Sequence, residues 1–172
     1  TSPNDSEFAA FRQGNWHNIT KRKFDIIYNE LRSNTYVCIT DGDIVFLNKD
    51  FMDFCLKHIE DNDLVIQNDN SSDDNHENLC SGFMFIKSSP KTIELFNPIN
   101  VEKDVQSGWG DQKYINKIKD KLDYKLLPVK LFPNGKYYYG NHKKLKPMMI
   151  HFNYAKGHDK KKLMKKYKKW YI

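Results

Sequence analysis

The chain has 172 residues, of which 39% are hydrophobic and 14% aromatic, so it is long enough to bury about two thirds of its unfolded surface and too aromatic for a disordered protein. No apolar run approaches the roughly 20 residues that span a bilayer, so we expect a single domain over residues 1–172 without a transmembrane segment. The formal net charge of +6 favours an anionic partner but does not identify one.

The first 66 residues predict two helices and two buried strands. Hydrophobic residues recur at helical spacing over residues 18–31 and again over residues 52–59. Short β-rich runs at residues 36–40 and 64–66 predict buried strands. The first of these strands ends abruptly at an acidic turn, Asp41-Gly42-Asp43.

The remaining sequence continues to alternate strands with helices. The elements predicted in chain order are a polar loop at 68–78, a strand at 82–86, helices at 90–96 and 111–118, a strand at 126–129, a turn at 133–135, a strand at 148–150 and a Lys-rich helix from Asp159. Pro128 lacks an N–H group, which places its strand at an edge. The alternation predicts an α/β fold with a mostly parallel sheet flanked by helices.

Two compositional features restrict the chemistry. The three cysteines, Cys38, Cys55 and Cys80, lack the spacing of a zinc site or a disulfide framework, so we expect free thiols. From residue 141 onward there are 11 lysines and one acidic residue, Asp159. A polyanion, a membrane surface or a phosphorylated ligand could each use this basic tail.

The acidic turn is the first indication of a reaction site. Asp41 and Asp43 follow a buried strand, and in open α/β sheets ligands bind beyond the carboxyl ends of the strands. Two carboxylates one residue apart can share one Mg²⁺ or Mn²⁺ ion, which commonly also binds substrate phosphates. A solvated turn explains the same residues, because Asp and Gly are the commonest turn residues. The triplet alone leaves both interpretations open.

Three further motifs follow it, each where an element meets a loop. They are Ser81-Gly82-Phe83-Met84 just after Asn78, Asp111-Gln112 with Asn116, and His151 followed by Gly157 and Lys160. With these motifs the sequence resembles the nucleotide-diphospho-sugar transferases, which are metal-dependent glycosyltransferases of GT-A fold. The resemblance is strongest to the xylosyltransferase-like members, more distant to the glycogenin-like ones, and spans residues 41–160.

The resemblance implies a GT-A-like (Rossmann-like) fold and a nucleoside-diphosphate sugar as donor, in particular a UDP-sugar. Only 40 residues precede Asp41, so we expect the N-terminal part of the nucleotide-binding half to be short or missing. Transfer would proceed to an unidentified glycan or protein acceptor, with retention of configuration.

The resemblance also implies a metal site of Asp41, Asp43 and His151. Imidazole suits Mn²⁺ better than Mg²⁺, which favours manganese as the cofactor. Taken alone, a histidine that follows the apolar run Met148-Met149-Ile150 is more often a partly buried structural residue.

For the donor sugar, the resemblance implies catalytic roles for Asp111 and Gln112. Asp111 would position or support the sugar and Gln112 would lie at the reaction centre, and the sequence assigns no nucleophile. A helix N-cap explains Asp111 equally well. The implied donor-binding residues are Asp41, Asn78, Ser81, Gly82, Lys156, Gly157 and Lys160.

Other interpretations remain open. Trp109 and Tyr137–Tyr139 could form an acceptor platform, although aromatic clusters are more often packing residues. A nucleotidyl- or phosphotransferase could use the same carboxylates, and a noncatalytic module could bind a polyanion through the Lys-rich tail. Nucleic acid is a poor partner, because the chain has too few arginines for the usual interleaving of Arg with aromatic residues.

Overall fold

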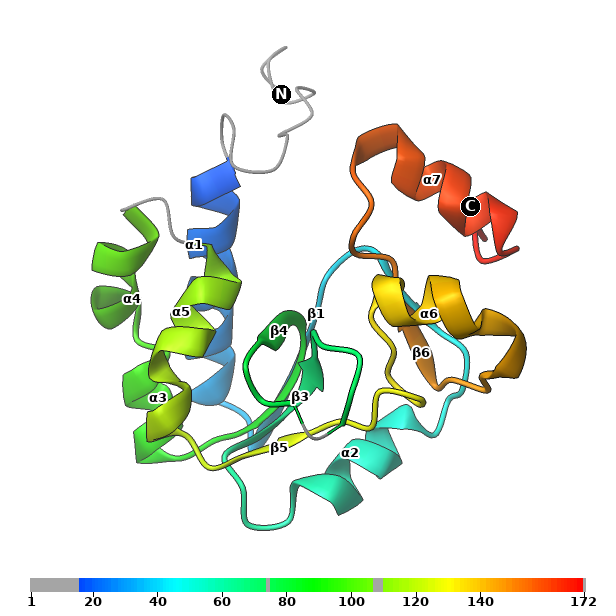
Figure 1. The fold of residues 1–172 in the computed structure, drawn as a ribbon. Coiled ribbons are helices and arrows are strands. Elements are labelled where there is room, and N and C mark those ends of the chain that lie inside the picture. Colours follow the sequence, from blue (N-terminus) through cyan, green and yellow to red (C-terminus); the bar gives the residue numbers. More distant parts are fainter. Residues whose placement is uncertain (1–15, 74, 107–109, 172) are drawn as a thin grey trace.

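The computed structural model describes residues 16–73, 75–106 and 110–171 (Figure 1). Its central sheet has four strands in the order β1-β4-β3-β5. Their bounds are Tyr36–Thr40 for β1, Leu64–Asn68 for β3, Leu79–Lys87 for β4 and Tyr124–Leu126 for β5. The predicted acceptor residue Trp109 lies outside the described residues.

The predicted α/β class is confirmed, and the sheet is mixed. β1 and β3 both pair antiparallel with β4, while β3 pairs parallel with β5. Three strands therefore run in one direction and β4 runs against them, so neighbouring strands are less often parallel than predicted. The reason is the connection from β3 to β4, which is the polar loop around residues 69–78 rather than a crossover helix.

Helices cover both faces of this sheet. On one face lie α1 (Trp16–Leu31), α3 (Pro90–Leu95), α4 (Pro98–Gln106) and α5 (Asp111–Ile118), and on the other lies α2 (Phe51–Ile59) (Figure 1). Successive residues of the central strands point to opposite faces. Ile66 thus packs with Phe24 and Ile115, whereas Val65 packs with the cluster that contains Ile59.

A second, two-stranded sheet supports the right-hand side of the molecule in Figure 1. Its strands β2 (Ile44–Phe46) and β6 (Met149–His151) are antiparallel, and the helices α6 (Gly135–Asn141) and α7 (Gly157–Lys166) lie beside them. Val45, Ile150, Phe152, Tyr138 and Met164 form the buried cluster between these elements. The short 3-10 helices η1 (Lys119–Lys121) and η2 (His142–Lys144) complete the fold.

Several predicted bounds change. The expected strand at 126–129 lies at a sheet edge, as predicted, but spans Tyr124–Leu126. The Lys-rich helix begins at Gly157 rather than Asp159, and the turn at 133–135 leads directly into α6, where the side chain of Asn134 accepts a hydrogen bond from the Tyr137 N–H at 2.9 Å. The three cysteines are free thiols, as predicted. Nowhere in the described ranges is a helix both long and apolar enough for a membrane span.

Candidate active site

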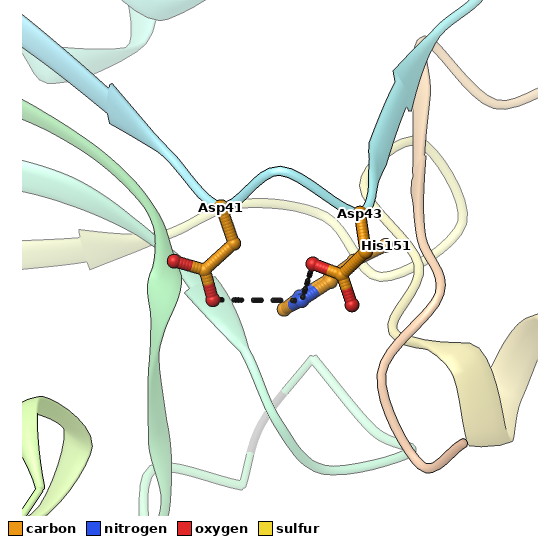
Figure 2. Close-up of side chains that lie close together, drawn as sticks. All are labelled: Asp41, Asp43 and His151. Carbon is orange, nitrogen blue, oxygen red and sulfur yellow. Dashed lines mark ion pairs between the residues drawn. The ribbon is translucent and has the colours of Figure 1, made fainter. Parts of the chain in front are cut away.

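The turn between β1 and β2 and the end of β6 bring three potential metal ligands together (Figure 2). The β2–β6 register pairs Ile44 with His151, which brings the histidine next to Asp43. His151 Nε2 lies 3.2 Å from Asp43 Oδ1 and 3.9 Å from Asp41 Oδ2. One ligand atom from each of the three residues lies within 4.8 Å of the others, which suits a single divalent ion.

The imidazole of His151 is oriented by Gln67, on β3. Gln67 Nε2 donates to the carbonyl oxygen of Phe132 at 3.1 Å, so its side-chain oxygen faces His151 Nδ1 at 2.8 Å. An amide oxygen only accepts, so Nδ1 donates to Gln67 and Nε2 is the ring nitrogen that faces the carboxylates. Metal-binding histidines commonly have a partner of this kind on the second nitrogen.

Gly82 on β4 gives the His151 ring its space. A Cβ atom added to Gly82 would lie 2.2 Å from His151 Cε1, far inside any normal contact. The position therefore requires glycine because of a close approach rather than a special backbone conformation. This gives the predicted donor-site glycine a role in holding the histidine.

Asp43 lies between two partners, His151 and Lys160. Its Oδ2 forms an ion pair of 2.6 Å with Lys160 of α7, and its other oxygen faces His151. Burial alone would raise the pKa of Asp43, but the hydrogen bonds and charges of His151 and Lys160 outweigh burial and hold the pKa far below its usual range. The carboxylate is therefore ionised whenever the protein is folded near neutral pH.

Lys23 of α1 is a site residue that sequence reasoning did not single out. Its ammonium contacts Asp111 Oδ2 at 2.7 Å, Asp41 Oδ1 at 2.9 Å and the carbonyl oxygen of Ser81 at 2.8 Å. Burial would lower the pKa of Lys23, but the two carboxylates raise it above its usual value. Conversely, burial would raise the pKa of Asp111, and Lys23 together with hydrogen bonds from Ser81 and Gln112 lowers it. Lys23 thus connects the acidic turn to the start of α5.

A second polar group surrounds Asp69, which follows β3 and was also missed. Its carboxylate accepts hydrogen bonds from Gln112 Nε2 at 2.9 Å, Asn78 Nδ2 at 3.0 Å and Asn153 Nδ2 at 3.1 Å. The hydroxyl of Tyr154 donates to the Asp69 carbonyl oxygen at 3.1 Å. The predicted residues Gln112 and Asn78 therefore lie together, held by a carboxylate that the motifs did not indicate.

The remaining predicted donor-site residues lie at the first turn of α7 and along β4. Lys156 is the exposed N-cap of α7, and Gly157 begins the helix with a left-handed φ of 51° that a glycine adopts easily. Asn116 binds the backbone N–H and carbonyl of Leu79 at 2.9 Å each, so it fixes α5 against β4 rather than facing the metal ligands.

Comparison with known proteins places this chain in a family. Residues 1–164 match the family model for nucleotide-diphospho-sugar transferases. The chain belongs to this family. As a nucleotide-diphospho-sugar transferase it is a member of a group of glycosyltransferases, and the predicted resemblance to this family is thereby confirmed.

Among curated proteins, this transferase is similar to the UDP-galactose:fucoside alpha-3-galactosyltransferase of Dictyostelium discoideum. The two are 29% identical over 184 residues, which cover 86% of this chain and 27% of the relative. The chain thus spans about a quarter of the length of that relative.

Solved structures support the fold. A glycosyltransferase involved in the glycosylation of the major capsid of PBCV-1 superimposes with a TM-score of 0.64 at 13% identity, covering 96% of this chain and 81% of the other. Mouse xyloside xylosyltransferase 1 in its apo form gives a TM-score of 0.53 at 12% identity, covering 84% and 67%. The GT-A-like architecture of this transferase is therefore confirmed.

Proposed function

We propose that the protein is a divalent-cation-dependent glycosyltransferase that moves a sugar from a UDP-sugar to an acceptor with retention of configuration. UDP-galactose is the donor to test first, because the curated relative from Dictyostelium is named for it. The acceptor is a glycan or a glycosylated protein.

The observation that carries this proposal is the convergence of Asp41, Asp43 and His151. Two hard carboxylate oxygens and one imidazole nitrogen form a donor set that suits Mn²⁺ well and Mg²⁺ acceptably. These ligands are preorganised, because Gln67 fixes the imidazole ring of His151 and Lys23 fixes the carboxylate of Asp41. Bound there, the metal ion would neutralise charge on the leaving diphosphate.

The lysines beside the metal ligands have separate tasks. Lys160 lies next to Asp43, where its ammonium can also bind a diphosphate oxygen and stabilise the charge that develops on the leaving group. Lys23 is enclosed by carboxylates and a carbonyl oxygen, so it holds the site together rather than meeting the donor. Lys156 is close enough in sequence to Lys160 to add a second phosphate contact.

We assign the Asp69 group to the donor sugar. Its carboxylate and three amide side chains offer both acceptors and donors, which is what the hydroxyl groups of a sugar require. Gln112 links this group to Asp111, its neighbour at the start of α5. Because Lys23 binds the Asp111 carboxylate, we assign Asp111 to positioning and electrostatic support and not to nucleophilic attack.

The decisive test is the release of UDP from UDP-galactose, with Mn²⁺ or with a chelator, by the wild type and by Asp43→Asn. We expect wild-type release to depend on Mn²⁺. The substitution should lower it by at least about a hundredfold, because a charge-stabilising metal contributes several kcal/mol. Asp120→Asn is the matched control, since Asp120 is exposed on η1, and it should keep wild-type release.

Three outcomes would contradict the proposal. Release of UDP that is equal with Mn²⁺ and with chelator would show that the reaction does not require the metal ion. Equal activity of Asp43→Asn and wild type would show that the Asp43 carboxylate takes no part in the reaction. Release of pyrophosphate or phosphate instead of UDP would favour a nucleotidyl- or phosphotransferase.

A further inference from the structure

A hollow with cationic walls lies at the end of the β2–β6 ladder opposite to the metal ligands. Asp43 and His151 are at one end of the ladder, and Leu47, whose N–H donates to the Met148 carbonyl at 2.8 Å, is at the other. Leu47 is four residues beyond Asp43 along an extended segment, a distance of about 13 Å. The hollow has a volume of about 600 Å³, and its lining includes none of the candidate active-site residues.

Three lysines line this hollow and remain unneutralised. Lys49 comes from the loop before α2, Lys146 from the segment before β6, and Lys169 from the tail after α7. None of the three forms an ion pair with another described residue, and no acidic residue lines the hollow. By contrast, Lys23 and Lys160 are paired with carboxylates. The hollow therefore concentrates positive potential in a concave surface.

One amide side chain in the lining adds hydrogen-bonding capacity. The side-chain oxygen of Asn48 accepts from the Asp50 N–H at 2.8 Å, which leaves the Asn48 NH₂ group as a donor. The ring of His142 packs edge-on against Tyr167 at 4.9 Å, and its Nδ1 is buried with no hydrogen-bond partner among the described residues. This nitrogen is not exposed to the hollow, so the site does not depend on it.

We propose that this hollow is a second ligand site, which binds the phosphate monoester of a small molecule such as a sugar phosphate. Its volume suits one small ligand. Three ammonium groups around one concavity match a compact dianion, for which lysine is an established partner. The partly exposed side chains of Leu47, Leu145 and Pro147 in the wall offer an apolar surface to the carbon skeleton of the ester. The site makes no use of the metal ligands, so it stands independently of the proposed glycosyl transfer.

The test is to titrate glucose 6-phosphate, inorganic phosphate and unphosphorylated glucose into the full chain by ligand-observed NMR, with chelator present. We expect glucose 6-phosphate to bind more tightly than phosphate, and glucose not to bind. The double variant Lys146→Gln with Lys169→Gln should weaken glucose 6-phosphate binding about fivefold or more, from the summed loss of two charge contacts near the surface.

Two controls separate this site from general charge and from the diphosphate position. Lys136→Gln with Lys165→Gln removes the same charge from exposed positions on α6 and α7 outside the hollow, and it should bind as the wild type does. Lys160→Gln should also bind as the wild type does. A loss on Lys160→Gln would place the ligand beside Asp43, and equal losses in both double variants would indicate a diffuse polyanion surface. Either result, or no binding by the wild type, would overturn the proposal.

Discussion

Contacts on three sides hold His151 between the buried core and the carboxylates of the candidate metal site. Gln67 fixes one ring nitrogen, Asp43 faces the other, and Gly82 leaves room for the ring itself. The side chain is only 3% exposed, so its position depends on packing as much as on hydrogen bonds. A change at Gly82 should therefore alter metal binding without altering any ligand.

Gly82→Ala is the prediction at this scale. The added Cβ would overlap the imidazole and displace it, so we expect Mn²⁺ affinity to fall tenfold to a hundredfold, about the effect of losing an outer-shell partner. Overpacking should lower the free energy of unfolding by about 1–3 kcal/mol. Mn²⁺ binding followed by electron paramagnetic resonance and urea unfolding measure the two effects.

Gly42→Ala is the matched control, because a Cβ at Gly42 meets nothing within 4 Å. It should change Mn²⁺ affinity less than twofold although Gly42 lies between two of the ligands. If Gly82→Ala binds Mn²⁺ as tightly as Gly42→Ala does, then the His151 ring is not held by the contact with β4.

At the residue scale, sequence reasoning proposed the three metal ligands but not the residues that hold them. Asp41, Asp43 and His151 belong to motifs with a recognisable order. Lys23, Gln67 and Asp69 belong to no such motif. Lys23 is one of several charged residues on an amphipathic helix, Gln67 follows the predicted strand at 64–66, and Asp69 lies in the predicted polar loop at 68–78. Their roles follow only from the contacts that the sheet and α1 create, which a local pattern does not contain.

At the scale of elements, Lys23 joins α1, the acidic turn and α5 through one partly buried ammonium group. The side chains of Lys23 and Asp111 are 14% and 17% exposed, so neither charge is well solvated without the other. Removing one partner leaves the other charge poorly solvated. The resulting loss in the free energy of unfolding is larger than the net stabilisation that the intact pair provides.

Asp111→Asn should therefore destabilise the fold in a pH-dependent way. Because the folded-state pKa of Asp111 is lowered, its contribution is present above the pKa of about 3.9 of an unfolded aspartate and fades as the pH falls through the lower folded value. We expect a loss of about 2–4 kcal/mol at pH 7 and a clearly smaller loss at pH 3. Urea unfolding at both pH values measures this, and an equal loss at both would show that Asp111 acts without its charge.

The elements themselves were predicted with uneven success. Helix α1 and the strands β1 and β3 have clear periodicity and were found. The helix at Pro98–Gln106 was missed, because its residue Val101 is buried while Ile99 is 74% exposed, so that no continuous apolar stripe marks it. The predicted edge strand was shifted because ladder pairing ends near Leu127, whose N–H donates to the Ile66 carbonyl just before Pro128.

At the scale of the whole molecule, a bound cation would join segments that are far apart in the chain. The acidic turn belongs to the first third and His151 to the last strand, so an ion held by both stabilises the folded state over the unfolded one. The effect does not depend on donor, acceptor or turnover.

We therefore expect Mn²⁺ at a hundred times its dissociation constant to raise the thermal midpoint by about 5–10 °C, which corresponds to about 2.7 kcal/mol for a chain of this length. Thermal unfolding followed by circular dichroism measures the shift. Asp120→Asn should show the same shift and Asp43→Asn little or none. A shift of equal size in Asp43→Asn would place the bound ion elsewhere.

The ladder between β2 and β6 also determines when Asp41, Asp43 and His151 can come together during synthesis of the chain. It pairs residues more than a hundred positions apart, and loops of that length close late because their entropic cost precedes any gain from contact. The carboxylates emerge from the ribosome long before the imidazole does. A nascent chain can thus build its central sheet before Asp41, Asp43 and His151 come together, and the candidate cation site is complete only after the last described strand has docked.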